Sequence, residues 1–176
     1  PGMDLSQTAE WIRREIGGAF TWDEIARYRD VWKGPLVLKG VLHPQDAELA
    51  VSMGIDGLFV TNHGGRQIEA LPSSIDALPA IARQVAGRAT LILDSGVRSG
   101  VDVARAIAVG ADAAFAGKSF LWSLGALGPQ GPGHLINILS EDLRATMGQL
   151  GCMKVEDLRN VPRRHKTAWS DDDFKL

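Results

Sequence analysis

The sequence is poor in cysteine. Cys152 is the single cysteine among 176 residues, so the chain cannot form an internal disulfide, and no CxxC pair or Cys/His cluster suggests a zinc site. Cys152 follows the expected end of a helix and is interpreted as a small packing residue. Because a chain without structural disulfides is typical of a reducing compartment, we expect a cytoplasmic protein.

Long apolar runs and a strong net charge are also missing. No apolar run approaches the roughly 18 residues that a membrane-spanning helix needs, and residues 1–4 lack the features of a signal peptide. Peripheral membrane association stays open. The formal net charge of −2 gives no bulk electrostatic reason to expect nucleic acid as a partner. Because the sequence starts with Pro1 and Gly2, we expect that it begins inside a longer gene product.

The remaining composition is that of an ordinary soluble domain. Hydrophobic residues make up 45% and charged residues 23% of the chain, which is long enough to bury a core. We expect a loop or lead-in segment over residues 1–20, a folded domain over 21–160 and a tail over 161–176. The tail combines a basic run with three aspartates, which is typical of a solvated terminus.

Helix-forming and strand-forming segments alternate along the domain. Thr21 and Glu24 have the spacing of a capping box, and short apolar runs bounded by glycine or proline indicate buried parallel strands. A Gly/Pro-rich loop is expected over 128–133 and a short helical turn over 155–159. The expected helices span 22–32, 45–53, 74–85, 101–109 and 134–150, and the expected strands span 36–39, 58–61, 90–93 and 113–116.

The sequence also contains an internal repeat of two βα units. Five residues recur at an offset of 56 positions, namely Asp46, Ala50, Gly54, Asp56 and Phe59, which return as Asp102, Ala106, Gly110, Asp112 and Phe115. Repeated βα units with right-handed crossovers predict an α/β fold with a parallel sheet, either closed into a barrel or open. A complete (β/α)₈ barrel takes about 250 residues, so four strands supply half of one.

Each expected strand ends in a polar or glycine-rich loop. In parallel α/β folds ligands bind at the carboxyl ends of the strands, so these loops are expected to converge on one site. Taken singly, their glycines are more often simple turns and their cations solvated surface charges. The four loops are Lys39–Gly40, Asn62–Arg66, Asp94–Arg98 and Gly117–Ser119.

Two of these loops have the composition of an anion site. Glycines let backbone N–H groups approach a ligand closely, and Arg98 and Lys118 supply positive charge, which together favour a phosphorylated ligand. Asp94 repels a phosphate but can accept hydrogen bonds from sugar-like hydroxyls; its alternative role is that of a helix-capping carboxylate. His63 and Arg66 suit a different group, because an imidazole can accept a proton near neutral pH and a guanidinium matches a carboxylate. This pair favours a substrate with an acid group beside a hydroxyl.

The same residues resemble a known family. Four motifs occur in the order and approximate spacing of the FMN-dependent α-hydroxy-acid oxidases and dehydrogenases, a group of the glycolate oxidase, lactate oxidase and mandelate dehydrogenase type. The resemblance runs from about Thr21 to Leu158, and its Asn-His-Gly-Gly-Arg-Gln stretch is highly specific. The motifs are Val37–Gly40, Thr61–Gln67, Asp94–Gly100 and Gly117–Phe120.

This resemblance implies the C-terminal half of a TIM (β/α)₈ barrel, strands five to eight, which binds FMN and oxidises an (S)-2-hydroxy acid to the 2-oxo acid. His63 is then the active-site base, Arg66 binds the substrate carboxylate, and Lys39 approaches the flavin N1 and O2 edge. The other implied flavin contacts are Thr61 near the ring, Asp94 at the ribityl chain, and Ser95, Gly96, Arg98, Gly117 and Lys118 at the phosphate.

The sequence departs from the family pattern in two ways. Ser95 stands where the family usually has glycine, and Lys118 stands where it usually has arginine. The family's N-terminal half also supplies a tyrosine pair, a second arginine, the carboxylate that orients the histidine and the backbone beside flavin N5, none of which lies in this chain. We therefore expect a separate or clipped N-terminal half-barrel as partner, and the resemblance implies a homo-oligomer, a tetramer in the family. The alternatives are a non-catalytic flavin- or phosphate-binding half-barrel and another FMN-linked barrel enzyme.

Overall fold

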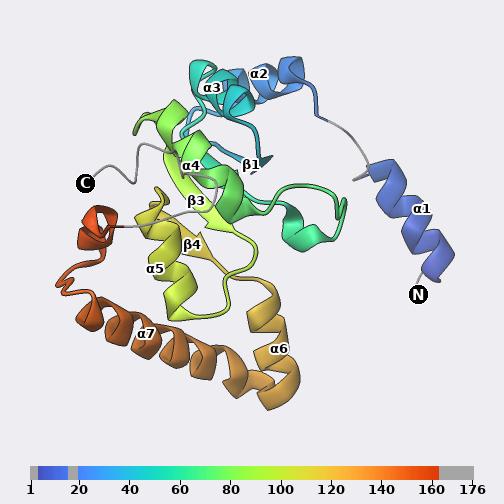
Figure 1. Cartoon of the computed structure of the whole chain (residues 1–176). Helices are drawn as coiled ribbons and strands as arrows, with labels where there is room; N and C mark the ends of the chain where they lie inside the picture. The colour runs from blue at the N-terminus through green and yellow to red at the C-terminus, as the bar shows by residue number, and fades with distance from the viewer. Residues whose placement is uncertain (1–3, 16–19, 163–176) are drawn as a thin grey trace. The chain divides into compact units, whose positions relative to one another are not determined.

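The computed structural model describes residues 4–15 and 20–162 (Figure 1). The chain divides into two compact units, residues 1–34 and 35–176, and each is described by itself. The first contains the helices α1 (Leu5–Glu15) and α2 (Trp22–Val31), and the second contains all the strands. The domain boundaries expected at residues 20/21 and 160/161 stay predictions.

Residues 5–15 of the expected loop or lead-in segment form the helix α1. Gln7 donates its N–H to Asp4 Oδ1 at 2.8 Å, and Asp4 donates its N–H to Gln7 Oε1 at 3.1 Å. This reciprocal pair is a capping box, and the spacing of three residues between Asp4 and Gln7 is its signal in the sequence. The capping box expected for α2 is confirmed, because Thr21 Oγ1 accepts the Glu24 N–H and Glu24 Oε2 accepts the Thr21 N–H.

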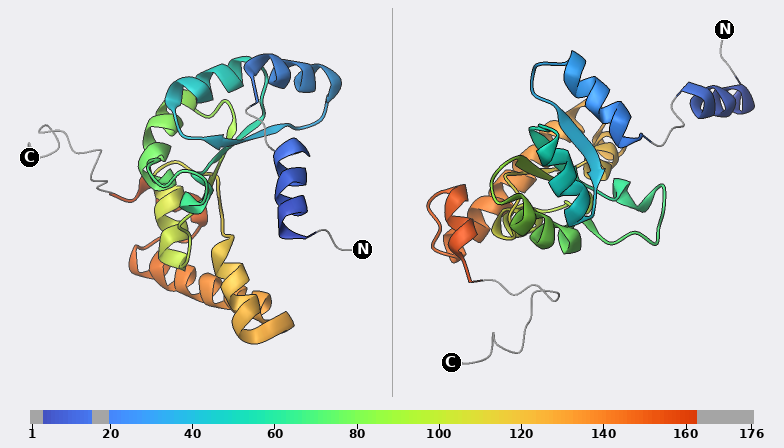
Figure 2. Two further views of the ribbon diagram at one scale, coloured as in Figure 1. Left: turned by 90° about the vertical axis from the view of Figure 1, so that its right-hand side faces the viewer. Right: turned by 90° about the horizontal axis from the view of Figure 1, so that it is seen from above.

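The second unit is built on a four-stranded parallel sheet in the order β1-β2-β3-β4. Three helices lie along one face of this sheet, as the views of Figure 2 show. The predicted alternation of strands and helices is confirmed, with bounds shifted by one or two residues. The strands are β1 (Val37–Val41), β2 (Gly57–Val60), β3 (Thr90–Asp94) and β4 (Ala113–Phe115), and the helices between them are α3 (Pro44–Ser52), α4 (Ser74–Val85) and α5 (Gly100–Ala108).

The two faces of the sheet differ in burial. On the helix-covered face Leu58 and Leu93 are almost fully buried and pack in the core with the helix residues Leu78, Ile81 and Val85. On the other face Val37 and Phe115 are 44% and 49% exposed, and Phe59 and Phe115 meet edge to face with ring centroids 4.9 Å apart. Within the described residues the outer edges of β1 and β4 are unpaired. Exposed apolar side chains beside open strand edges are typical of a surface that another element covers.

The sequence repeat has a structural counterpart at the starts of the strands. Asp56, just before β2, donates its N–H to Leu36 O at 2.9 Å and accepts the Leu36 N–H through Oδ2 at 2.8 Å. Asp112, just before β4, forms the same two bonds with Leu91 at 2.7 and 2.8 Å. Two aspartates 56 residues apart therefore form equivalent hydrogen bonds, which join the starts of neighbouring strands.

The segment after β4 is more helical than expected. Helix α6 (Lys118–Leu127) begins inside the expected loop, and the turn η2 (Gly128–Gln130) and the start of α7 (Gly131–Gln149) replace the expected Gly/Pro-rich loop. Pro129 and Pro132 stand in first-turn positions, where a missing N–H removes no helical hydrogen bond. The short turn η3 (Val155–Asn160) confirms the last prediction. Of the helices described, none is long and apolar enough to cross a membrane.

Glu48 on α3 is joined to the end of α4. Its carboxylate accepts hydrogen bonds from Arg88 Nη1 and Gln84 Nε2, both at 2.9 Å, and from Arg88 Nη2, so the pKa of Glu48 is lowered to about 2. Because the folded protein binds this proton more weakly than the unfolded chain, the contribution of Glu48 to stability is complete above pH about 4.5 and is lost as pH falls toward 2.

A Glu48→Gln variant is therefore expected to lose less stability than the parent protein between pH 4.5 and 2. Urea unfolding at a series of pH values measures this difference. The difference is small because the pair is partly exposed, and an identical pH dependence of the two proteins would contradict the assignment.

Candidate active site

The loops at the carboxyl ends of the four strands line one open cavity of about 770 Å³. This size lies within the usual range of ligand pockets. Of the ten site residues expected from the sequence, only Thr61 is not a lining residue; it is buried beneath the others and bonded to them. The nine lining residues are Lys39, His63, Arg66, Asp94, Ser95, Gly96, Arg98, Gly117 and Lys118.

The turn after β2 presents His63 and Arg66 to this cavity. His63, Gly64 and Gly65 all have left-handed backbones, with φ values of 60°, 68° and 71°. The His63 N–H bonds Thr61 Oγ1 at 3.0 Å, and the Gly64 N–H bonds Asn62 Oδ1 at 3.0 Å. The two side chains are exposed, and neither has a hydrogen bond or ion pair within the described part of the chain. They are therefore positioned by the backbone of the turn and not by side-chain partners.

Lys39 and Asp94 approach each other across the cavity floor. Lys39 lies on β1 just before a bulge at Gly40, whose φ is 100°, and its Nζ is 3.9 Å from Asp94 Oδ2. The Lys39 side chain is 50% exposed, so this pair adds little to stability. Asp94 Oδ2 also accepts a hydrogen bond from Thr61 Oγ1 at 2.8 Å. A lysine so placed carries its charge into the cavity.

The third and fourth loops add backbone N–H groups and cations to the lining of the cavity. Ser95 and Gly96 have φ values of 83° and 81°, so this turn carries two consecutive left-handed residues. Helix α6 starts at Gly117 without a side-chain cap, whereas α2, α3, α4 and α5 each have one. Arg98 is exposed, and Lys118 Nζ donates to Gly64 O at 2.7 Å. Uncapped N–H groups beside two cations suit an anion.

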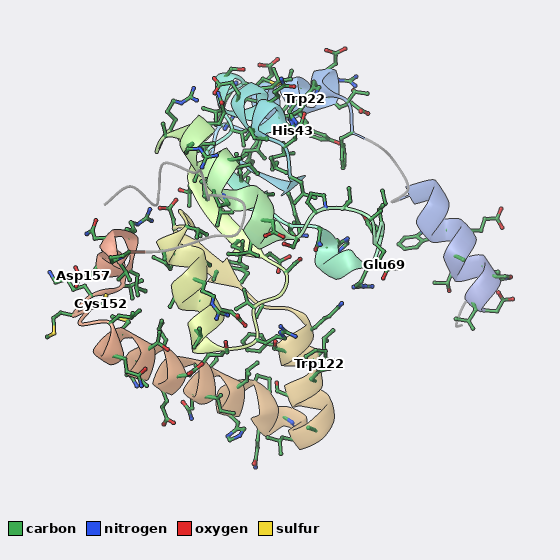
Figure 3. All side chains as sticks on the ribbon, in the orientation of Figure 1. Trp22, His43, Glu69, Trp122, Cys152 and Asp157 are labelled. Atoms are coloured by element: carbon green, nitrogen blue, oxygen red, sulfur yellow. The ribbon has the colours of Figure 1, made fainter. Side chains whose placement is uncertain are left out.

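Sequence reasoning missed several lining residues. Leu121 and Trp122 line the cavity from α6, and Figure 3 labels Trp122 on that helix. They were missed because no helix was predicted after the expected loop over 117–119, and Ser119, Phe120 and Trp122 have only moderate helix propensity. Asn62 was expected only as part of the loop, yet its side chain caps the His63 turn. Figure 3 places Cys152 at the end of α7, and it is not a lining residue.

Metal ligation has no counterpart among the residues described. In 4–15 and 20–162, no three His, Cys, Asp or Glu side chains come together in a group able to hold a metal ion. Besides His63, the charged side chains that line the cavity are five cations and two carboxylates, a balance that suits an anionic ligand.

Comparison with known proteins gives one consistent family. Residues 2–164 match the family model described as FMN-dependent dehydrogenase. The chain is 44% identical over 156 residues to L-lactate dehydrogenase of Bartonella quintana (strain Toulouse), covering 89% of this chain and 41% of that protein. It is 42% identical over 148 residues to L-lactate dehydrogenase of Pectobacterium atrosepticum, covering 84% and 38%.

Solved structures of mandelate oxidase resemble this fold. A mandelate oxidase mutant with a monooxide FMN adduct matches with a TM-score of 0.79 and 38% identity, covering 84% of this chain and 47% of that one. Mandelate oxidase with (S)-2-phenylpropionate gives the same score and identity, with 44% of its chain covered. This likeness confirms an α/β fold that forms part of a TIM barrel.

The chain spans about two fifths of the length of the curated relatives it matches. The family model nevertheless covers nearly all of the chain and includes every residue of the cavity. The chain therefore belongs to the family of FMN-dependent dehydrogenases.

Proposed function

We propose that this chain is the cofactor-binding and catalytic C-terminal half of a TIM-barrel enzyme that oxidises a small 2-hydroxy acid to the 2-oxo acid with FMN. One observation carries the proposal. A single cavity joins the turn that bears His63 and Arg66 to the two loops that suit a phosphate. A base, a carboxylate clamp and a phosphate site in one cavity match a flavin and an acidic substrate bound side by side.

The residues present fit FMN. The phosphate would be held by backbone N–H groups near Ser95 and Gly96, by the uncapped start of α6 at Gly117, and by the cations Arg98 and Lys118. Asp94 would accept hydrogen bonds from ribityl hydroxyls, with Thr61 below it. Lys39 would stabilise negative charge at the flavin edge. Bound FMN supplies the two-electron acceptor, and the protein positions it and tunes its charge.

The substrate would be bound and deprotonated by the His63 turn. Arg66 offers a planar fork for a carboxylate, and the imidazole of His63 accepts a proton from the neighbouring carbon or hydroxyl. Neither side chain is occupied by a partner within the described residues, so both can serve a ligand. The relatives named L-lactate dehydrogenase and mandelate oxidase favour a small (S)-2-hydroxy acid.

Strands from outside these residues would complete the barrel. The exposed apolar face with Val37 and Phe115, and the unpaired edges of β1 and β4 in the described residues, support this partner. We expect an N-terminal half-barrel, on a separate or clipped chain, and a homo-oligomer of the completed barrels. Native mass measurement of purified protein tests this expectation. A single species at 18.9 kDa, with no larger parent and no second polypeptide, would refute it.

The absorption spectrum of the complete protein tests the proposed activity. We expect a bound flavin whose visible band is bleached anaerobically by at least one member of a panel of 2-hydroxy acids. A flavin that no such acid reduces would support a non-catalytic binding role or another FMN-linked reaction. Protein that binds no flavin at all would refute the cofactor assignment.

A further inference from the structure

The turn that carries His63 is unfavourable by itself. His63 has a side chain at φ 60°, followed by two more left-handed residues, Gly64 and Gly65. Such a conformation is sparsely populated for residues other than glycine and persists only where the surroundings fix it. The position of the His63 imidazole therefore depends on what holds this turn.

Both backbone polar groups of Gly64 are held by residues from other loops. Its N–H donates to Ser95 Oγ at 2.9 Å, in addition to the local bond with Asn62. Its carbonyl oxygen accepts from Lys118 Nζ at 2.7 Å. A Cβ atom at Gly64 would lie 3.2 Å from Lys118 Cε, so the lysine covers the turn closely. The loop after β3 and the start of α6 thus both form hydrogen bonds to Gly64, the residue that follows His63.

The bonds behind Ser95 have a fixed direction. The Asp94 carboxylate only accepts, so Thr61 donates its hydroxyl hydrogen to Asp94 Oδ2 at 2.8 Å. Ser95 then donates to Thr61 Oγ1 at 2.9 Å, which leaves Ser95 Oγ to accept the Gly64 N–H. Thr61 is 2% exposed. Consecutive hydrogen bonds polarise and strengthen one another where water is excluded. The sequence of bonds runs from Gly64 through Ser95 and Thr61 to Asp94.

Ser95 is itself an unusual choice for its position. Its φ is 83°, a conformation that glycine adopts freely and serine does not. A serine here is unfavourable unless its hydroxyl is used, and this hydroxyl makes two hydrogen bonds. The side chain of Ser95 therefore has a role beyond the backbone N–H that the loop offers to an anion.

We propose that Ser95 and Lys118 are positioning residues for the base. Their hydrogen bonds to the N–H and the carbonyl oxygen of Gly64 hold the neighbouring His63 in place. This inference rests on the proposed function for the role of His63 as base. It assigns to both residues a task separate from holding the cofactor phosphate. Loss of either hydrogen bond leaves the turn less restrained, so the His63 imidazole and the Arg66 side chain on the same turn lose their fixed positions.

The test compares variants of the complete flavoprotein by hydrogen exchange of the segment 62–66 and by the rate of flavin reduction at saturating flavin. Ser95→Ala removes the hydroxyl and keeps the backbone N–H, and Lys118→Met removes the ammonium. We expect exchange in 62–66 to quicken about five- to tenfold in each, since one hydrogen bond is lost. Flavin reduction should slow about ten- to a hundredfold, as for a misplaced catalytic group. Lys118→Arg, which keeps a donor, should recover most of the rate.

Two further variants keep the test decisive. Ser95→Gly lacks the hydroxyl but suits φ 83°, so it should fold well and still show fast exchange at 62–66. Ser99→Ala removes another hydroxyl between β3 and α5. The Ser99 hydroxyl accepts the Asp102 N–H and does not bond Gly64, so exchange at 62–66 should stay unchanged.

Unchanged exchange at 62–66 in Ser95→Ala, Ser95→Gly and Lys118→Met would overturn the inference. The inference would also be overturned if these variants bound flavin more weakly but reduced it at the parental rate once flavin was saturating. That result would mean that the two residues only contact the phosphate. The exchange measurement needs no substrate. If no 2-hydroxy acid reduced the flavin of the parent protein, the proposed function would be refuted. The exchange measurement would still decide whether Ser95 and Lys118 hold Gly64.

Discussion

Replacement of His63 by alanine is expected to leave the flavin bound and to slow its reduction by a 2-hydroxy acid about 10²- to 10⁴-fold, the usual contribution of a general base. His63 lies on the turn after β2, and the groups that suit the flavin phosphate lie on the loops after β3 and β4. The substitution therefore removes the proton acceptor and spares the cofactor site. Stopped-flow reduction, with flavin content measured by absorbance, gives both quantities.

A second variant guards against a backbone effect. Histidine and asparagine are both enriched in the left-handed region whereas alanine is not, so His63→Ala adds backbone strain at φ 60°, and asparagine avoids this strain without being a base. We expect His63→Asn to be as slow as His63→Ala. Reduction at the parental rate in either variant would remove His63 from the mechanism.

Arg66→Ala is the matched contrast on the same turn. A charge-assisted contact to a carboxylate contributes about 1.5 to 3 kcal/mol, so the substrate concentration for half-maximal reduction should rise about ten- to a hundredfold. The limiting rate should fall much less than in His63→Ala. Equal losses of limiting rate in the two variants would contradict the separate roles of base and clamp.

Replacement of Gly100 by alanine is expected to destabilise the fold by more than about 3 kcal/mol, among the largest effects of a single added methyl group. An added Cβ would lie 2.1 Å from Leu143 N, 2.6 Å from Asp142 C and 2.7 Å from Leu139 O, all backbone atoms of α7. Backbone cannot rotate away as a side chain can, so α5 and α7 would have to separate. The start of α5 would also lose its bond from Gly100 N to Asp142 Oδ2, now 2.7 Å.

Gly148→Ala in α7 is the control with the opposite sign. An added Cβ at Gly148 meets no atom within 4 Å, and alanine is the better helix former by about 1 kcal/mol. Thermal or urea unfolding should show Gly100→Ala strongly destabilised and Gly148→Ala unchanged or slightly more stable. A stable Gly100→Ala protein would mean that α5 and α7 do not pack this closely.

Local signals in the sequence predicted much of the second unit. The short apolar runs and the repeat at an offset of 56 gave the order of strands and helices. The four polar loops were expected to meet because parallel strands end at one edge of a sheet, and nine of the ten expected residues line one cavity. These features depend on neighbours in the chain and on the geometry of βα units, so periodicity and spacing reveal them.

Where local signals were weak or overlooked, the predictions failed. Helix α6 begins after a glycine with no side-chain cap, and the start of α7 carries Gly131, Pro132 and Gly133, residues that favour a loop. Gly131 lies so close to α6 that an added Cβ would be 2.0 Å from Ser123 O. Tertiary packing of α7 against α6 thus outweighs the poor local propensity of the segment.

The sequence by itself determined the alternation of strands and helices, the family and nine of the residues that line the cavity, because each follows from local pattern or from a specific motif. Only the tertiary structure decided how those residues act on one another. Gly64 is held by Ser95, 31 positions away, and by Lys118, 54 positions away, and the Gly100 N–H at the start of α5 donates to Asp142, 42 positions away. Bonds over such separations depend on how the loops and helices come together in space, and no local pattern in the sequence encodes them.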